Sequence, residues 1–145
     1  MTAFAFALAL TAARWSPAVA ARCAELRPIV APLAVAYGVE PDLALGVMGW
    51  ESGCRPVRGG AGTDHWGPGQ VRWATWGPAL RREGIADSPE ALLHRLPGTW
   101  AAVRVLAAHL RDRRGLCGFA GATGKRCADY TAGVEGMRAR IGGGR

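Results

Sequence analysis

The chain has 145 residues, half of them hydrophobic, and carries a formal net charge of +7 from 18 basic and 11 acidic residues. This length suits a single domain with its own core, and no repeat or long polar tract indicates a solenoid or a disordered chain. The positive net charge favours binding of an anionic polymer. The basic residues are scattered, however, and no zinc-finger or RRM signature occurs, so we expect no nucleic-acid partner.

The first 20 residues have features of a secretory signal peptide. Residues 3–13 are apolar and too few to span a bilayer, and Ala18-Val19-Ala20 forms a cleavage site of small residues. We predict a signal peptide over residues 1–20, a domain over residues 21–145, and export to the periplasm or the cell exterior, with a phage particle as the alternative location. The other interpretation is an N-terminal helix over residues 3–37, with Ser16 as its cap and Pro17 in its first turn.

Two helices are predicted before the glycine-rich middle of the chain. The first covers residues 28–37 and ends at Gly38. The second, Pro41–Ser52, begins with proline and places Leu43, Val47 and Trp50 on one face. It ends at Gly53, because only glycine takes the left-handed cap conformation cheaply.

The rest of the chain also predicts helices rather than strands. Residues 55–69 are rich in glycine and proline and predict a loop, and residues 74–82 predict a weak helical turn interrupted by Gly77-Pro78. Ser88-Pro89-Glu90 predicts the start of a helix that runs to residue 96, and Thr99 is expected to cap the next one, which ends before Gly115. A last helix is predicted over residues 127–141. The fold class is therefore mainly α, one domain with a cleft built by loops.

Glu51 is the candidate for catalysis. It falls in the last turn of the predicted helix, where the helix dipole disfavours a negative charge, and Ala44 and Met48 make its surroundings partly apolar. Both effects disfavour the ionised form and raise the carboxyl pKa, which suits a general acid. The alternative is a solvated surface glutamate, which is the commoner role of this residue.

The four cysteines form no Cys-x-x-Cys pair, so no metal site is indicated. Cys117 and Cys127 bracket a glycine-rich loop and would close it as a disulfide, which leaves Cys23 to pair with Cys54. Such bridges contribute about 2–4 kcal/mol each and suit an exported chain. Four buried free thiols are the alternative.

Four segments between residues 28 and 141 resemble the soluble lytic transglycosylase family, which is related to goose-type lysozymes. They are Ala36-Tyr37-Gly38-Val39-Glu40-Pro41 before the helix, Glu51-Ser52-Gly53 at its end, Gly67-x-x-Gln70-Val71 beyond it, and Ala128-Asp129-Tyr130-Thr131-Ala132-Gly133 near the C-terminus. Two departures occur, because Pro68-Gly69 replaces a Leu-Met pair and Thr131 stands where asparagine is usual.

The resemblance implies a lysozyme-like helical fold and a peptidoglycan lytic transglycosylase. Glu51 would act alone as acid and then base on the MurNAc–GlcNAc β-1,4 bond, and the muramyl 6-hydroxyl would replace water to give 1,6-anhydroMurNAc. No cofactor is implied. Tyr130 is expected to lie against Glu51, and Thr131 stands beside it. Ser52 would hold the substrate or the acid, or else bond back to a carbonyl of its own helix. The Gln70 amide would bind an N-acetyl group, or else lie on the surface.

Aromatic and histidine side chains near the glycine-rich loop supply further candidates. Trp66, between His65 and Gly67, is expected to stack on a sugar in the cleft, whereas Trp73 and Trp76 are expected in the core. His65 implies no metal site, because His94 and His109 lie in helical patterns.

A second carboxylate would change the reaction. Asp64 is the acidic residue of the motif region, and if it faced Glu51 across the cleft the product would be hydrolytic, as in the goose-type relatives. The runner-up is a cell-wall-binding module that keeps the fold without the chemistry. The expected partners are peptidoglycan glycan strands and a cell-envelope or secretion complex that places the domain, and we expect a monomer.

Overall fold

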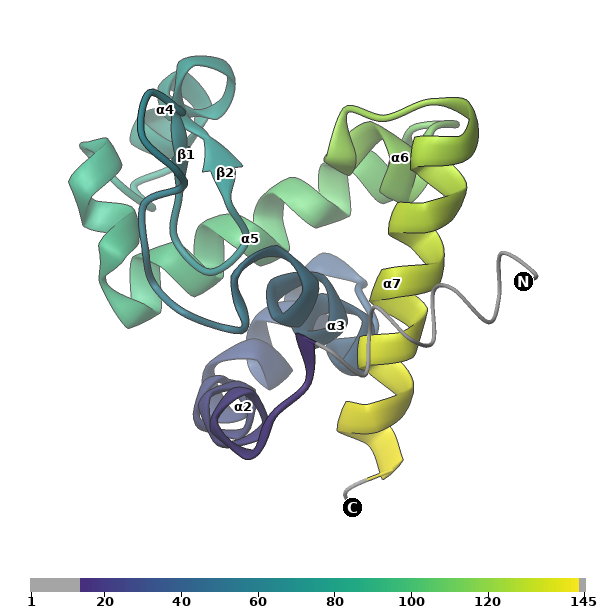
Figure 1. The fold of residues 1–145 in the computed structure, drawn as a ribbon. Coiled ribbons are helices and arrows are strands. Elements are labelled where there is room, and N and C mark those ends of the chain that lie inside the picture. The colour runs from purple at the N-terminus through teal and green to yellow at the C-terminus, as the bar shows by residue number, and fades with distance from the viewer. Residues whose placement is uncertain (1–13, 144–145) are drawn as a thin grey trace.

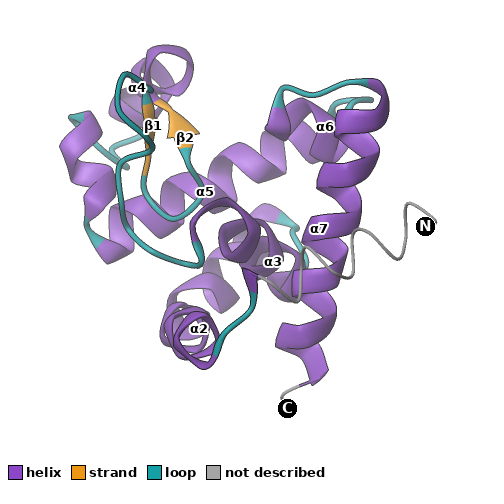
Figure 2. Ribbon diagram, in the orientation of Figure 1, coloured by secondary structure: helices purple, strands orange, loops and turns teal. Residues whose placement is uncertain are grey.

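The computed structural model describes residues 14–143 of the chain, and helices dominate them. In chain order the elements are α2 (Pro17–Tyr37), α3 (Pro41–Ser52), β1 (His65–Trp66), β2 (Val71–Arg72), α4 (Trp73–Arg82), the 3₁₀ helix η1 (Pro89–Leu93), α5 (Arg95–Arg111), α6 (Gly115–Ala120) and α7 (Gly124–Gly143) (Figures 1 and 2). The predicted mainly α class is confirmed. No helix within residues 14–143 combines the length and apolar character needed to cross a membrane.

Helix α2 begins earlier than residue 28, so that predicted start is wrong. Ser16 caps it by accepting from the Val19 N–H, and Pro17 takes the first position, as in the alternative interpretation. Pro28 and Pro32 lie inside the helix on its exposed side. Proline has no N–H to donate to the carbonyl one turn earlier, and on this side water can hydrogen-bond to that carbonyl instead. The proposed cleavage site at residues 18–20 falls within the first turns of α2. The apolar segment at residues 3–13 lies outside the described residues.

Helix α3 has the predicted bounds. The Glu40 carboxylate accepts from the N–H groups of Asp42 and Leu43, Pro41 follows, and Gly53 ends the helix with φ 65°. These local signals place Glu51 in the last turn.

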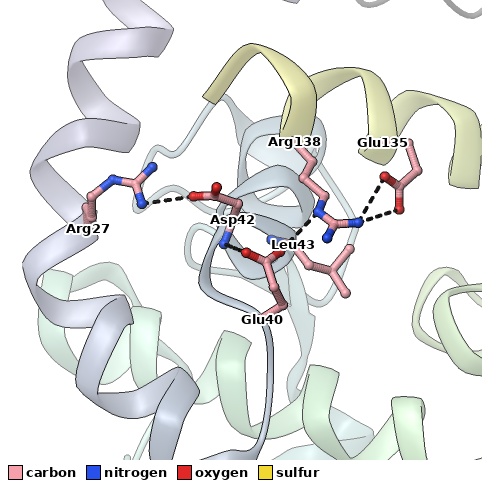
Figure 3. A network of polar contacts seen from close by, with 6 residues as sticks. All are labelled: Arg27, Glu40, Asp42, Leu43, Glu135 and Arg138. Carbon is pink, nitrogen blue, oxygen red and sulfur yellow. Dashed lines mark hydrogen bonds and ion pairs between the residues drawn. The ribbon is translucent and has the colours of Figure 1, made fainter. Parts of the chain in front are cut away.

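A chain of ion pairs fastens α3 between α2 and α7 (Figure 3). Arg27 of α2 lies 2.8 Å from the Asp42 carboxylate, and Arg138 of α7 lies 3.0 Å from Glu40 and 3.3 Å from Glu135. The pairs hold the first turn of α3 in place, at the opposite end of the helix from Glu51.

Two hydrophobic cores share helix α5. The first core lies among α2, α3, α5 and α7, and the second joins the β1–β2 hairpin, α4, η1 and α5. Leu106 of α5 faces the first core and Val105 the second, and Phe119 of α6 packs against both. In Figure 1 the hairpin and α4 stand on one side and α6 on the other, with α5 running between them.

The middle of the chain contains more regular structure than its glycine content predicts. Residues 55–69 are not all loop, because His65 and Trp66 pair antiparallel with Arg72 and Val71. Helix α4 continues through Gly77-Pro78 without a break. Pro78 is exposed, and Gly77 gives room to the Trp73 ring, which would lie 2.6 Å from a Cβ at that position.

Three predicted helix bounds in the second half are corrected. Ser88 caps a short 3₁₀ helix that ends at Leu93 rather than residue 96. Helix α5 begins at Arg95, because Pro97 is tolerated in a first turn, so Thr99 lies inside the helix and is not its cap. Helix α6 occupies part of the expected loop, and α7 begins at Gly124 instead of residue 127.

Both expected disulfides are present. Cys23 of α2 is joined to Cys54, just beyond α3, with a Cα–Cα distance of 5.2 Å. Cys117 of α6 is joined to Cys127 of α7 at 5.1 Å. The first bridge fixes the end of α3 on α2, and the second holds α6 beside α7. The alternative of four free thiols is therefore excluded.

Candidate active site

A cleft of about 640 Å³ lies between the hairpin–α4 side of the molecule and α6. Its walls come from β1, β2 and α4 on one side and from α5 and α6 on the other, and Glu51 lies at its border. The ionisable and aromatic side chains in its lining are Glu51, Asp64, His65, Arg72, Trp76, His109 and Phe119.

Glu51 is partly buried in this border position. Burial raises the pKa of its carboxyl above the ordinary value, and this effect outweighs the hydrogen bond from Tyr130 and the positive charge of Arg14, which both lower it. The sequence predicts this direction from the apolar neighbours of Glu51. A carboxyl that keeps its proton towards neutral pH suits a general acid.

Tyr130 comes from α7 and lies against Glu51, as the resemblance implies. Its hydroxyl donates a hydrogen bond of 2.7 Å to Glu51 Oε1. Burial and the nearby carboxylate raise the pKa of the Tyr130 phenol, so the phenol keeps its proton and remains a donor. Glu51 Oε2 receives no hydrogen bond from the residues that the structure describes.

The contact between Tyr130 and Glu51 depends on close packing of α7 on α3. Gly133 lies directly against the Trp50 ring, since a Cβ at residue 133 would come within 2.5 Å of it. On the other helix, a Cβ at Gly46 would lie 3.0 Å from the Val134 carbonyl oxygen. The two glycines therefore set the separation at which the Tyr130 hydroxyl reaches the carboxyl.

Ser52 is buried and fastens the loop that follows α3. Its hydroxyl lies 2.7 Å from the Pro68 carbonyl oxygen and 3.2 Å from that of Met48, and it accepts from the Arg55 N–H at 3.0 Å. The bond back to Met48 is the structural alternative that the sequence left open. Ser52 does not line the main cleft, so it positions the Gly67–Gln70 turn beside Glu51.

Gln70 lines the cleft, but its amide nitrogen is already engaged. It donates to the carbonyls of Val57 at 3.0 Å and Gly67 at 2.9 Å. The backbone of Gln70 is left-handed, with φ 49°, and these two bonds stabilise that turn. The side chain therefore braces the loop with its N–H groups, and the expected contact of its amide with an N-acetyl group stays a prediction.

The prediction is wrong for Trp66 and, in part, for Trp76, whereas Trp73 packs against the second core as expected. Trp66 is 8% exposed in the second core, donates to Asp64 through Nε1 at 2.9 Å, and is covered by the Arg58 guanidinium at 4.7 Å. It does not line the cleft, whereas Trp76 does. The β1–β2 pairing causes the difference, because residues that alternate along a strand point to opposite faces and Trp66 takes the buried one.

Trp76, His109 and Phe119 form an aromatic wall that sequence reasoning missed. Trp76 and Phe119 each meet the His109 ring edge to face, with centroid distances of 5.4 and 5.8 Å. Burial lowers the pKa of His109, so its ring is neutral at neutral pH. In the sequence Trp76 and His109 each lie in a helical pattern, and no sequence signal brings α4, α5 and α6 together.

Asp64 borders the same cleft but serves as a cap. Its two carboxylate oxygens accept from Trp66 Nε1 at 2.9 Å and from the Ala74 N–H at 2.6 Å, in the first turn of α4. These hydrogen bonds lower the pKa of Asp64, so it is ionised at neutral pH. A carboxylate whose two oxygens both accept hydrogen bonds from the protein suits a structural role better than that of a catalytic base.

Thr131 and His65 are the remaining candidates. Thr131 is partly buried on α7 and does not line the cleft, and His65 lines it at the end of β1. Within residues 14–143, no group of three His, Cys, Asp or Glu side chains could hold a metal ion.

Compared with protein families, with curated proteins and with solved structures, the chain matches none of them. The function is therefore inferred from the sequence motifs and from the geometry around Glu51.

Proposed function

We propose that the protein cleaves peptidoglycan glycan strands at the MurNAc–GlcNAc β-1,4 bond, as a lytic transglycosylase. The observation that carries the proposal is the 2.7 Å hydrogen bond from Tyr130 to Glu51 at the border of the cleft of about 640 Å³. It joins two of the four motif segments that resemble the soluble lytic transglycosylases. Both expected disulfides are compatible with export to the cell envelope.

In the proposed reaction Glu51 first acts as the acid. Its raised pKa keeps the proton that it gives to the glycosidic oxygen as the bond to C1 breaks. The substrate's N-acetyl group supports the positive charge at C1, which is the substrate-assisted exception to the use of two carboxylates.

Glu51 then acts as the base. As a carboxylate it takes the proton of the muramyl 6-hydroxyl, whose oxygen attacks C1 and closes the 1,6-anhydro ring. The proton that Glu51 lost is thereby restored, and no water is consumed. Tyr130 donates to Oε1 throughout, which fixes the carboxyl and leaves Oε2 for both proton transfers.

Hydrolysis assisted by Asp64 is the second candidate, and the position of Asp64 on the same cleft favours it. Its two hydrogen bonds to Trp66 and Ala74 count against it, because a base must be free to bind water. A non-catalytic wall-binding module is the third, favoured by the altered Pro68-Gly69 and Thr131 positions.

Digestion of purified sacculi tests the proposal. Wild type should reduce their turbidity and release fragments with anhydromuramyl ends, each lighter by one water than a reducing end. Glu51→Gln should be inactive, and Glu90→Gln, which changes an exposed glutamate of η1, should behave as wild type. Reducing ends alone would support the Asp64 hydrolase. Sedimentation of wild type with intact sacculi, without cleavage, would support the binding module.

A further inference from the structure

Glu51 also borders a second cavity, of about 230 Å³, that the proposed chemistry does not use. Its walls are the last turn of α3, the first turns of α2 and the three arginines Arg14, Arg22 and Arg55. Glu51 is the one acidic side chain in this lining, so the cavity carries an excess of positive charge immediately beside the catalytic candidate.

The arginines are held in place by the carbonyl groups at the end of α3. Arg22 Nε donates to Gly53 O at 2.9 Å and Arg55 Nε donates to Ser52 O at 2.8 Å. Arg14 donates to Trp50 O at 3.0 Å through Nη1 and stacks on the Trp50 ring at 4.0 Å. Capping the negative end of a helix is a sufficient reason for one such arginine.

Capping of α3 uses only a few of the N–H donors that these arginines carry. A guanidinium has five N–H donors, and Arg22 and Arg55 commit Nε to the backbone, which leaves the paired terminal nitrogens of each. This planar fork matches the two oxygens of a carboxylate. Both side chains are therefore preorganised, with their backbone bonds already made, to receive an anionic group.

We infer that this cavity is a subsite for a carboxylate carried by the muramyl residue, bound by Arg22 and Arg55. The inference rests on the proposed function, because the cleavage site of that reaction places a muramyl residue at Glu51, whose side chain lines both cavities. Arg14 adds charge, but its Nη1 already donates to the Trp50 carbonyl oxygen, so the subsite is assigned to Arg22 and Arg55.

Two sources supply such a carboxylate. A muramyl residue with its peptide stem carries the free carboxylates of that peptide, and a muramyl residue without its stem carries the carboxylate of its lactyl group. The test therefore uses three matched preparations of glycan strands: with the peptide stem, with the stem carboxyls amidated, and with the stem removed.

Wild type should cleave at least one carboxylate-bearing preparation with a kcat/KM roughly tenfold or more above that for amidated strands, as expected for a charged hydrogen-bonded pair. A preference for stem-bearing strands identifies the peptide as the source, and a preference for stripped strands identifies the lactyl group. In the double variant Arg22→Gln/Arg55→Gln the preference for carboxylate-bearing over amidated strands should disappear, whatever the rate on amidated strands. Arg82→Gln, an exposed arginine of α4 outside both cavities, is the matched charge control.

Two results would overturn the subsite. One is equal cleavage of all three preparations by wild type, and the other is a preference that persists in the double variant. Equal loss on every substrate would show that the arginines act through the fold or through Glu51, which also overturns the inference.

Failure of the proposed function would be recognised separately. If wild type cleaves none of the three preparations, binding of N-acetylmuramyl-L-Ala-D-Glu and of its diamidated form is compared by NMR titration. Binding of the acidic form alone, lost in the double variant, would support the subsite without the enzyme. Equal binding of both forms, or binding of neither form, would rule out the carboxylate subsite.

Discussion

Tyr130 on α7 donates a hydrogen bond of 2.7 Å to the Oε1 atom of Glu51 on α3, across 79 residues of sequence. The bond has two consequences. It orients the carboxyl at the border of the cleft, and it lowers the pKa of Glu51 against the larger effect of burial, which raises it. The acidity of Glu51 thus depends on how closely α7 packs on α3.

Tyr130→Phe tests the electrostatic part of this relationship. Removing the hydroxyl removes an influence that lowers the pKa of Glu51, so that pKa should rise further. The alkaline limb of the kcat/KM profile should therefore move to higher pH, and the maximal rate should fall by about tenfold or more as the carboxyl loses its orientation. Tyr37→Phe, at a tyrosine whose hydroxyl accepts from Trp100 Nε1 and which lines neither cavity, should keep the wild-type profile. An unchanged alkaline limb in Tyr130→Phe would contradict the assignment.

Glu51→Gln should stabilise the protein while abolishing catalysis. The folded pKa of Glu51 lies above its unfolded value, so its favourable contribution exists below the unfolded pKa and is lost as pH rises through the folded pKa. A neutral glutamine avoids that loss. Thermal unfolding of both proteins between pH 4 and pH 8 should give a difference in Tm, in favour of the variant, that grows with pH. A difference that shrinks with pH would mean that Glu51 is stabilising when ionised.

Asp64→Asn tests whether the Asp64 carboxylate caps helix α4 or acts in catalysis. As a cap of α4, Asp64 should contribute roughly 1–2 kcal/mol at neutral pH, and its replacement should cost part of that. The folded pKa is lowered, so this stability is present above the unfolded pKa and lost as pH falls through the folded one. The two proteins should converge in urea stability at low pH. Sacculus cleavage at a temperature where both are folded should stay within severalfold of wild type, whereas a loss of about 10² or more would point to a catalytic role.

Gly133→Ala tests the packing that brings Tyr130 to Glu51. The added methyl group would meet the Trp50 ring at 2.5 Å, so α7 must shift, and overpacking of this kind costs roughly 1–3 kcal/mol. Activity should fall together with stability, because the shift displaces Tyr130. Gly143→Ala, where nothing lies within 4 Å, is the control and should leave both unchanged. Full activity in Gly133→Ala would show that the Tyr130 contact tolerates movement.

The Cys23–Cys54 bridge should matter more for stability than the Cys117–Cys127 bridge. It closes a sequence separation of 31 residues against 10, and the entropy removed from the unfolded chain grows with loop length. Replacing both cysteines of the first pair by alanine should cost about 2–4 kcal/mol in urea unfolding, with a smaller loss for the second pair. The reverse order would mean that packing, not chain entropy, governs the two bridges.

The sequence by itself determined the features that depend on neighbours within one helical turn. Pro41 and Gly53 bound α3 and so place Glu51 in its last turn, and Ser16 and Pro17 supply the true start of α2. Capping and left-handed conformations are local properties, so reading them needs no knowledge of distant contacts. The cysteine spacing likewise led to the right disulfide pairs, because a short bracketed loop left one sensible partner for each remaining cysteine.

Only the tertiary structure decided which side chains meet in the cleft. Trp66 and Trp76 have the same chemistry, yet the strand pairing buries the first and the packing of α4 on α5 exposes the second to the cleft. The arginine cavity likewise exists because the first turns of α2 lie beside the end of α3. Burial and partners are set by which elements pack together, and that information is spread over the whole chain rather than held in any one segment of it.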